Sequence, residues 1–425
     1  QGTLVIGVSN SLSDGTAVTV LAGGTLDIGT YTDTIGSLAG EAGASVLLGS
    51  GAVLRTGNNN ASTTFAGVIS GDGSLAKAGS GTMYLTGANS YAGITTFAAG
   101  TVNVATVSNY GVDSSLGNRA ADSGAGNVGL LFQGGTLQYT GSTPQSTDRA
   151  IRVSTTGGAF IDASGSNSAA TLSFTRTTAS PDFYENGGNR QITFTGTNTG
   201  DNTFAMPITS HDVNSTTVNK TGPGTWVLSG ANTYRGVTYI HDGTLRVTSS
   251  AGLGQGGHDG ATMTWIYDGG ALELTGGINL SEHAHFRGDG PTGLGAIRSL
   301  SGANSFSDRL ALDADATINV EAGSTLTFTG AKSGSEGALY EAPGTGAGMT
   351  KIGDGLLRLN SGPTYTGATA VRGGKLFIAS AQGTDDFVNL SVANGGPVTL
   401  ANNASLALWQ TGNSSFNMPI VLDNS

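Results

Sequence analysis

Two histidines separated by one residue are the side chains of this sequence that come nearest to a metal site. In His283-Ala284-His285, both imidazoles would lie on one face of a strand, with Glu282 and Asp289 nearby in the sequence. No third ligand stands at a spacing typical of zinc sites, and exposed polar residues on a strand explain the pair equally well. We therefore expect no metal and no other cofactor. The remaining histidines are unevenly placed: His211, His241 and His258.

The densest group of carboxylates is Asp313-Ala314-Asp315, with Asp308 upstream. Side chains two residues apart on a strand share a face, as an acid/base pair or calcium ligands in a β-helical polysaccharide enzyme would need to. The run Leu310–Val320, however, alternates apolar and polar residues and so predicts a half-buried strand with Ala314 on the buried face. We therefore predict no catalytic residues and a protein that is not an enzyme. The alternative is a polysaccharide-processing enzyme with its active site in a side groove.

Arg287-Gly288-Asp289 spells an integrin-type tripeptide. Gly290 and Pro291 follow it, and this pair predicts a loop. Such a tripeptide also arises readily by chance in a glycine-rich chain. An adhesive role for Arg287, Gly288 and Asp289 is therefore one hypothesis, and chance occurrence of the tripeptide is the other.

A 28-residue motif occurs three times without a gap, at Lys77–Val104, Lys220–Val247 and Lys351–Ile378. Its closing residues alone occupy Gln1–Ile6. Self-similarity of this kind indicates a repeat architecture. The copies share these positions: Gly79, Gly222 and Gly353; Gly81, Gly224 and Gly355; Leu85, Leu228 and Leu359; Tyr91, Tyr234 and Tyr365; Gly93, Gly236 and Gly367; Thr95, Thr238 and Thr369; Gly100, Gly243 and Gly374.

The tyrosine of each copy invites a second functional interpretation. Tyr91, Tyr234 and Tyr365, together with the neighbouring Tyr84, Trp226 and Tyr239, could form an aromatic strip that binds sugars. A ring at the same position of every repeat is explained more economically by stacking or by packing at a corner of the fold. We prefer the structural interpretation.

Alternation of apolar and polar residues within each copy, as in Met83/Leu85 and Trp226/Leu228, predicts short strands with one buried face. Similar strands recur between the copies, too many for one sandwich or barrel, and no blade-length period favours a propeller. We predict an all-β chain that forms a parallel β-helix of degenerate repeats of about 100–140 residues. Residues 1–425 would then form a single continuous solenoid.

The composition limits the partners. Net charge is −11 and the 18 lysines and arginines are scattered, so nucleic acid and anionic lipid are poor partners. Cysteine is absent, and no apolar run approaches the length of a membrane span. Because the sequence opens within a copy of the motif, we expect an interior piece of a longer polypeptide. Membrane contact would then involve only a part of the parent outside this chain.

The first two copies fit the pattern K-x-G-x-G-T-x-x-L-x-G-A-N-[ST]-Y-x-G-x-T-x-[IF]-x-x-G-T-[VL]-x-V. This pattern resembles the autotransporter-associated β-strand repeat of bacterial surface passenger proteins, and the stretch 35–71 resembles the segment that leads into it. The third copy departs from the pattern at Ser361-Gly362-Pro363-Thr364 and at Lys375, which puts the geometry of that corner in question.

The resemblance implies a right-handed β-helical passenger that is exported and displayed outside a Gram-negative-type cell. The function we expect is that of an extracellular structural or adhesive segment, a stalk or fibre, in a large surface protein. Neighbouring copies, joined end to end or laterally, are the expected partners. Glycans and cell-surface receptors are further candidates.

Overall fold

The computed structural model describes residues 2–122, 128–180, 188–210, 214–256, 262–330, 337–360, 362–379, 396–401, 403–409 and 419–423. These residues form two compact units, Gln1–Thr217 and Val218–Ser425. Nearly all regular structure in the described part is β-strand, and its one helical element is the 3₁₀ turn η1 (Pro291–Gly293). No helix in these ranges is long and apolar enough to cross a membrane.

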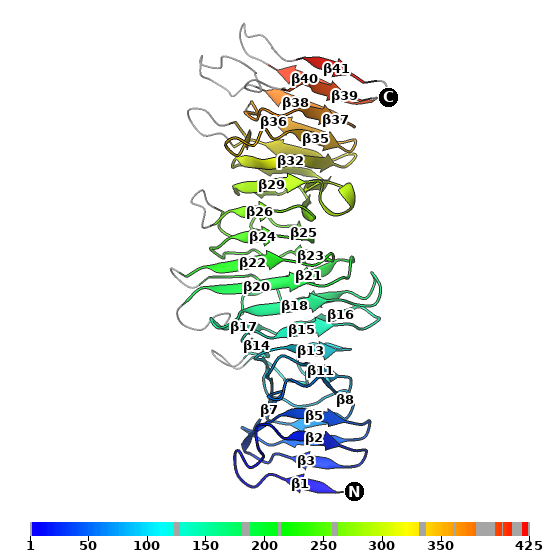
Figure 1. Ribbon diagram of the computed structural model, residues 1–425, viewed down its shortest axis with the longest axis vertical. Helices are drawn as coiled ribbons and strands as arrows, with labels where there is room; N and C mark the ends of the chain where they lie inside the picture. The colour runs from blue at the N-terminus through cyan, green and yellow to red at the C-terminus, as the bar shows by residue number, and fades with distance from the viewer. Residues whose placement is uncertain are drawn as a thin grey trace. The chain divides into compact units, whose positions relative to one another are not determined.

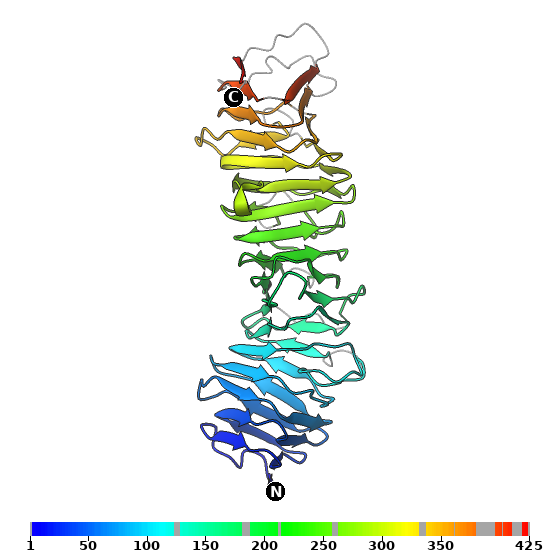
Figure 2. The ribbon, with the colours of Figure 1, turned by 90° about the vertical axis from the view of Figure 1, so that its right-hand side faces the viewer.

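Short parallel strands stacked in three series build unit 1 (Figures 1 and 2). From β3 to β11 the chain visits the three series in strict rotation. The first series is β1 (Thr3–Val5), β3 (Thr25–Asp27), β6 (Ser45–Leu48) and β9 (Val68–Gly71). The second is β4 (Thr32–Ile35), β7 (Val53–Thr56), β10 (Ser74–Lys77), β12 (Thr95–Phe97), β14 (Leu130–Phe132) and β17 (Ile151–Val153). The third is β2 (Ala17–Val20), β5 (Ser37–Gly40), β8 (Thr63–Phe65), β11 (Thr82–Leu85), β13 (Thr101–Val104), β15 (Thr136–Tyr139), β18 (Ala159–Ala163) and β20 (Arg190–Thr195). Three further strands pair with one another in the order β16 (Gln145–Thr147), β19 (Leu172–Phe174) and β21 (Asn202–Phe204).

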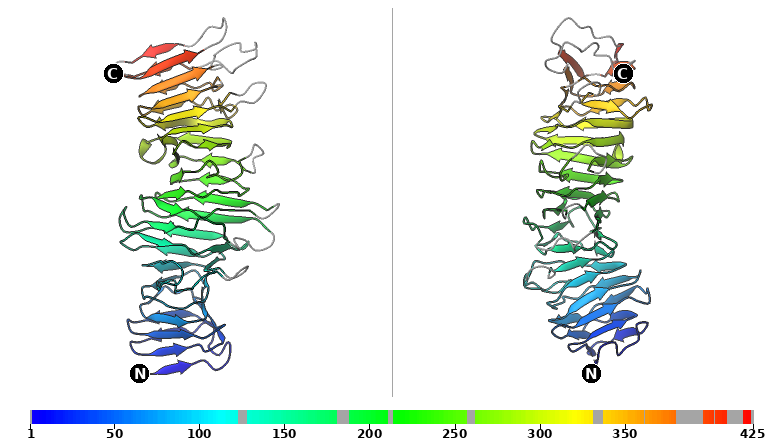
Figure 3. Two further views of the ribbon diagram at one scale, coloured as in Figure 1. Left: turned by 180° about the vertical axis from the view of Figure 1, so that it is seen from behind. Right: turned by 90° about the vertical axis from the view of Figure 1, so that its left-hand side faces the viewer.

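Unit 2 repeats the arrangement, and the view from behind shows its strands also running side by side (Figure 3). One series is β22 (Thr216–Lys220, in this unit from Val218 on), β24 (Thr238–Ile240), β26 (Thr264–Ile266), β29 (Ala284–Gly288), β32 (Leu310–Val320), β34 (Leu339–Glu341), β35 (Met349–Ile352), β37 (Thr369–Val371), β39 (Val398–Leu400) and β41 (Ile420–Leu422). A second is β23 (Thr225–Leu228), β25 (Gly243–Val247), β27 (Gly270–Thr275) and β30 (Ile297–Ser301). The third is β28 (Asn279–Leu280), β31 (Ala303–Phe306), β33 (Thr325–Phe328), β36 (Leu356–Leu359), β38 (Lys375–Ala379) and β40 (Ser405–Trp409).

The register shows that each turn of chain lies on the one before. Leu54, for example, lies between Asp33 on one side and Leu75 on the other, and both pairings are parallel. Each strand thus finds hydrogen-bond partners for its backbone in the turns above and below, with no need for a crossover helix. This confirms an all-β parallel β-helix in each unit. That both units form one continuous solenoid stays a prediction.

In strands such as β7 and β15, every second residue points inward and fills the core. Leu85 of unit 1, and Leu228 and Leu359 of unit 2, are all fully buried, as the alternation predicts. Inside unit 1 the rings of Phe97 and Phe132 stack with centroids 4.5 Å apart. The leucine shared by the repeats is therefore a core residue in all three copies.

The prediction that Ala314 lies on the buried face is wrong. Ala314 and Asp315 are both exposed, because β32 changes partners at this point. Its first half pairs with β29 and β34, and its second half pairs with β30 and β35. The register with β29 shifts between Phe286 and Gly288, which marks a bulge at the bend.

We predict that Leu228→Asp lowers the free energy of unfolding by roughly 4 kcal/mol or more, because it removes core packing and buries an unpaired charge. The measurement is urea unfolding followed by circular dichroism. The matched control is Leu47→Asp, at an outward strand position that is 41% exposed, where a change within about 0.5 kcal/mol is expected. Equal effects of the two substitutions would contradict the assigned faces.

Candidate functional site

The repeat motif is a unit that pairs with itself. In the first copy β11 lies beside β13, with Leu85 opposite Val104. The same pairing recurs as Leu228 opposite Val247 and as Leu359 opposite Ile378. Each copy therefore covers parts of two adjacent turns of the coil, and a residue inserted between its two paired strands would break their register.

The lysine that opens each copy lies inside the fold. The Lys220 Nζ donates hydrogen bonds to the carbonyl oxygens of Thr221 (3.0 Å), Gly222 (2.6 Å) and Asp242 (2.8 Å). Lys351 likewise bonds the carbonyls of Ile352, Gly353 and Gly373, and Lys77 bonds those of Ala78 and Gly79. In the second and third copies one ammonium thus ties together the corners of two successive turns. The sequence analysis did not anticipate this role.

Burial is the main influence on these lysines. It lowers the pKa of Lys220 to about 7 and those of Lys77 and Lys351 to about 8. The carbonyl oxygens act in the opposite direction, because they accept hydrogen bonds from the charged form. For Lys220, the nearby Asp242 also favours the ammonium.

The last shared glycine of each copy lies at the corner that the buried lysine binds, and the geometry there requires glycine. Gly100, Gly243 and Gly374 have φ between 60° and 68°, in the left-handed region. A Cβ atom at Gly243 would also lie 2.4 Å from the carbonyl oxygen of Gly222 and 2.7 Å from the Lys220 Nζ. A side chain at this position would therefore displace the lysine from its carbonyl ligands.

The repeat tyrosines are corner residues and not a sugar-binding strip. Tyr91, Tyr234 and Tyr365 are buried, and each hydroxyl shares a hydrogen bond with the threonine four residues later, at 2.7, 2.6 and 2.5 Å. Burial raises the pKa of Tyr91 and Tyr365 to about 12. Pro363 in the third copy leaves this corner hydrogen bond in place. Of the neighbouring aromatics, Trp226 is also buried, whereas Tyr84 is exposed and Tyr239 is half-buried.

We predict that Lys220→Met lowers the free energy of unfolding by roughly 3 kcal/mol, because three carbonyl oxygens lose their donor while the buried stem is kept. Urea unfolding measures the change. Lys375→Met, at an exposed lysine of the same unit, is the control and should change stability by less than about 0.5 kcal/mol. An equal, small effect of both variants would show that the ammonium does not stabilise the corner.

Outward-facing rings meet on one face of unit 2. Tyr239 of β24 lies opposite Trp265 of β26, which lies opposite His285 of β29. The next positions in this register are Ala311 and Tyr340. Figure 1 shows β24, β26, β29 and β32 as one stack, coloured green to yellow. We call Tyr239, Trp265, His285 and Tyr340 the aromatic strip. The sequence analysis considered Tyr239 for a sugar-binding strip, but with other aromatic residues as its neighbours.

The rings of the strip stack with their neighbours. Trp265 and His285 have centroids 4.2 Å apart at an interplanar angle of 20°. Beside the strip, His241 stacks on Tyr267 at 4.8 Å, and the Arg287 guanidinium lies 5.1 Å from the centre of the Tyr267 ring. Planar side chains from three successive turns therefore lie in two stacked groups, one around Tyr267 and one around His285.

Hydrogen bonds fix the two histidines of the His283-Ala284-His285 segment. The Nδ1 of His285 lies 2.8 Å from the Oδ1 of Asp313, and the Nε2 of His283 lies 2.8 Å from the hydroxyl of Tyr340. Asp315 has a different partner: its Oδ1 accepts a hydrogen bond from the backbone N–H of Gly348 at 2.7 Å. The two aspartates are thus bound to separate partners and do not form the acid/base pair that their spacing suggested.

In the described ranges, no group of three or more histidine, aspartate or glutamate side chains is placed to hold a metal ion. His211 and His258 lie outside the described residues. The absence of cofactors stays a prediction.

The Arg-Gly-Asp tripeptide is only partly in a loop. Arg287 and Gly288 are the last residues of β29, and Asp289 follows the strand. The Arg287 side chain lies 3.5 Å from the carboxylate of Asp268, and the Asp289 carboxylate accepts a hydrogen bond from Thr317. Both charged side chains therefore already have partners within unit 2, and an adhesive role for the tripeptide stays a prediction.

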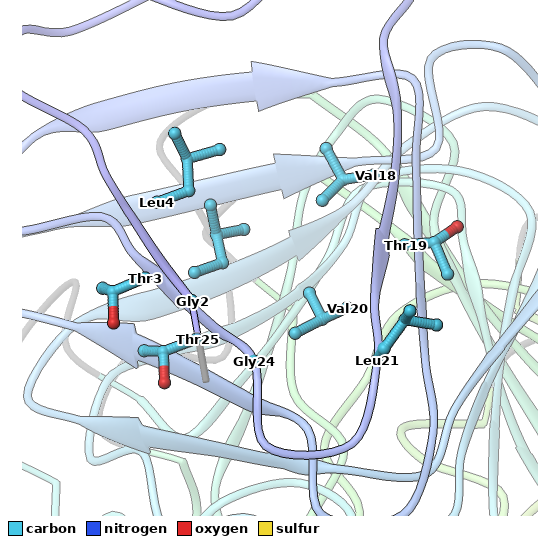
Figure 4. Close-up of a pocket in the computed structure, with 10 residues that line it drawn as sticks. Gly2, Thr3, Leu4, Val18, Thr19, Val20, Leu21, Gly24 and Thr25 are labelled. Carbon is cyan, nitrogen blue, oxygen red and sulfur yellow. The ribbon is translucent and has the colours of Figure 1, made fainter.

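A hollow of about 330 Å³ lies at the first turns of unit 1 (Figure 4). Leu4, Val18, Val20 and Leu21 are among its lining residues, and no charged side chain lines it. Its walls offer apolar surface and threonine hydroxyls, which is not a set suited to acid/base or metal chemistry.

A buried carboxyl group lies next to the strip. Burial raises the pKa of Glu282 to about 8, and nearby Asp308 acts in the same direction. The Oγ1 of Thr264 donates a hydrogen bond to the Oε1 of Glu282 at 2.7 Å and opposes this shift. Glu282 therefore keeps its proton to a higher pH than an ordinary carboxyl group.

We predict that this proton makes stability depend on pH. Because the folded pKa lies above the ordinary value of 4.5, the stability that the proton contributes is fully present below that value and is lost as the pH rises towards about 8. Relative to Glu282→Gln, the loss should approach 1.4 kcal/mol per pH unit; the contributions of Lys77, Lys220 and Lys351 are common to both proteins and cancel in the difference. Urea unfolding of both proteins between pH 4 and 9 measures it. Parallel curves for the two proteins would contradict the raised pKa.

The comparisons with known proteins agree with this geometry. Residues 75–104, 218–247 and 349–376 match the family described as Passenger-associated-transport-repeat. The chain is 31% identical over 389 residues to "Adhesin BmaC autotransporter" of Brucella suis biovar 1 (strain 1330). The alignment covers 86% of this chain and 9% of that adhesin, so the chain spans a small part of its relative. No solved structure matches the chain.

The three family matches coincide with the three self-paired motifs, each beginning two residues before the buried lysine. The resemblance drawn from the sequence is thereby confirmed. The chain is an autotransporter passenger-type protein built on passenger-associated transport repeats.

Proposed function

We propose that the chain is an extracellular structural and adhesive segment, a β-helical stalk or fibre, of a large autotransporter-type protein on the outer surface of a Gram-negative-type bacterium. The observation that carries the proposal is the 31% identity to an autotransporter adhesin across 86% of this chain. Such a segment holds binding surfaces away from the cell. It also needs a fold that can be lengthened turn by turn.

The distribution of shared residues supports this function. Positions that the copies hold in common are internal: the lysine, the leucine and the tyrosine are buried in all three. The outward position next to the repeat threonine is Thr96 in the first copy, Tyr239 in the second and Ala370 in the third. The repeats thus share a shape, and their surface is free to vary.

The enzyme alternative is supported by a specific observation, the His285–Asp313 pair, which could act as a general base. Against it, Asp313 and Asp315 bind separate partners, and the repeats preserve no acid in common. We propose a binding and structural role without catalysis. Glycan cleavage by the purified chain that is lost in Asp313→Asn would favour the enzyme instead.

The partners follow from the proposed location. A net charge of −11 makes nucleic acid an unfavourable partner. Neighbouring copies, joined end to end or laterally, and glycans or receptors on another cell are the partners that suit a surface fibre. Membrane contact would belong to another part of the parent protein.

The test is an in-frame deletion of this segment from the parent gene. We expect attachment of the bacteria to host cells or surfaces to fall at least several-fold, while the parent protein still reaches the surface, as immunolabelling would show. The matched control replaces the segment with other repeats of equal length. If bacteria with the replaced segment attach fully, the segment acts as a stalk. If they attach less, the segment itself takes part in binding. Normal attachment after simple deletion would contradict both.

A further inference from the structure

From the geometry of unit 2 we infer that the aromatic strip on β24, β26, β29 and β34 is a binding surface for an uncharged oligosaccharide. The inference rests on the proposed adhesive function and names the ligand class that this surface would take. It concerns Tyr239, Trp265, His285 and Tyr340, with Arg287 and Asp268 at the rim.

The strip is not part of the shape that the repeats share. At the position of Tyr239 the other two copies have Thr96 and Ala370, and their turns stack without a ring there. The turns of the β-helix therefore do not require aromatic residues at this outward position. Half-exposed rings at Tyr239, Trp265 and His285, in direct register on three consecutive strands, indicate a use for the surface itself.

The dimensions of the strip suit a linear chain. From Tyr239 to Tyr340 the register takes four steps, or roughly 19 Å at about 4.8 Å per step. With His241, Tyr267 and Arg287 beside it, the ring surface is still only two side chains wide. A stable protein interface needs about 800 Å² on each partner, much of it apolar at the centre. Among the described residues of unit 2, the exposed large aliphatic side chains all lie outside the strip: Leu294, Leu408, Ile420, Val421 and Leu422.

The chemistry of the strip favours a polyol. Planar rings supply contact area at a low cost in side-chain entropy, while their polar atoms can bond hydroxyl groups. Asp313 occupies the Nδ1 of His285, which leaves Nε2 as the ring nitrogen for a ligand hydroxyl. At the rim, Arg287 and Asp268 provide a planar donor and a carboxylate acceptor, with side chains 38% and 73% exposed.

Charge selects an uncharged ligand over an acidic one. The arginines at the strip already have partners, since Arg287 lies beside Asp268 and the Arg309 guanidinium lies 5.3 Å from the centre of the Tyr340 ring. The net charge of the chain, −11, adds a general repulsion of anions. A neutral sugar chain needs no positive partner and is not repelled by the net negative charge.

The experiment measures binding of the purified 425-residue chain to a printed array of neutral, N-acetylated and acidic oligosaccharides. Isothermal titration with chitohexaose, cellohexaose and the strongest neutral glycan of the array then gives Kd values. We expect at least one neutral glycan to bind, and Trp265→Thr to weaken that binding at least tenfold. Threonine is chosen because it occupies outward strand positions elsewhere, such as Thr96. Tyr84→Thr, at an exposed tyrosine of unit 1, is the matched control and should leave Kd unchanged.

Three results would overturn the inference: no neutral glycan binds, only acidic glycans bind, or binding is unchanged in Trp265→Thr with its unfolding transition intact. A fourth outcome identifies a protein ligand. In that case attachment of the chain to cells would depend on Trp265 but would survive enzymatic removal of the cells' glycans, and the glycan assignment would be wrong. The adhesive function would then stand, because the chain would still attach to cells.

Discussion

The backbone hydrogen bonds between successive turns are the constraint on which the rest of this structure depends. A strand in a parallel ladder must follow the path of the strand above it closely enough for every N–H and C=O to find a partner. Side chains that point inward are then stacked on side chains of the neighbouring turn, as Phe97 is on Phe132. Different residues are tolerated where the chain leaves the ladder and at outward strand positions, as at Thr96, Tyr239 and Ala370.

Corners are where such a coil is most vulnerable, because the chain turns and its carbonyl groups lose their ladder partners. In the second and third repeats a buried ammonium, that of Lys220 or Lys351, donates hydrogen bonds to three carbonyl oxygens from two turns. Beside it, a glycine with positive φ leaves room for the contact. A hydroxyl pair such as Tyr234 with Thr238 closes the next corner without exposing a polar atom to the core. These features explain why lysine, glycine, tyrosine and threonine recur together.

Much of the fold was predictable from the sequence, since alternation identifies buried residues such as Leu228 whatever lies around them. The exposed Ala314 was not, because the bend in β32 arises from its neighbours' register and leaves no local trace. The aromatic strip was not predicted as a set for a similar reason. Tyr239, Trp265 and His285 are unevenly spaced along the chain and come together only through strand pairing. A shared signal did exist, since each lies between two buried residues of a short strand. Buried lysines were missed because a charged residue at the end of a strand is ordinarily expected to be in water.

Self-pairing of the motif has a consequence for how proteins of this kind change over generations. Because β11 and β13, or β23 and β25, already lie beside each other within one copy, the segment contains both surfaces of its own junction. A recombination event that duplicates whole turns around it in the gene would carry these ammonium, glycine and tyrosine corners with it. Length can then be gained or lost in whole turns. Outward residues such as Tyr239 can diverge afterwards in one copy without affecting the others.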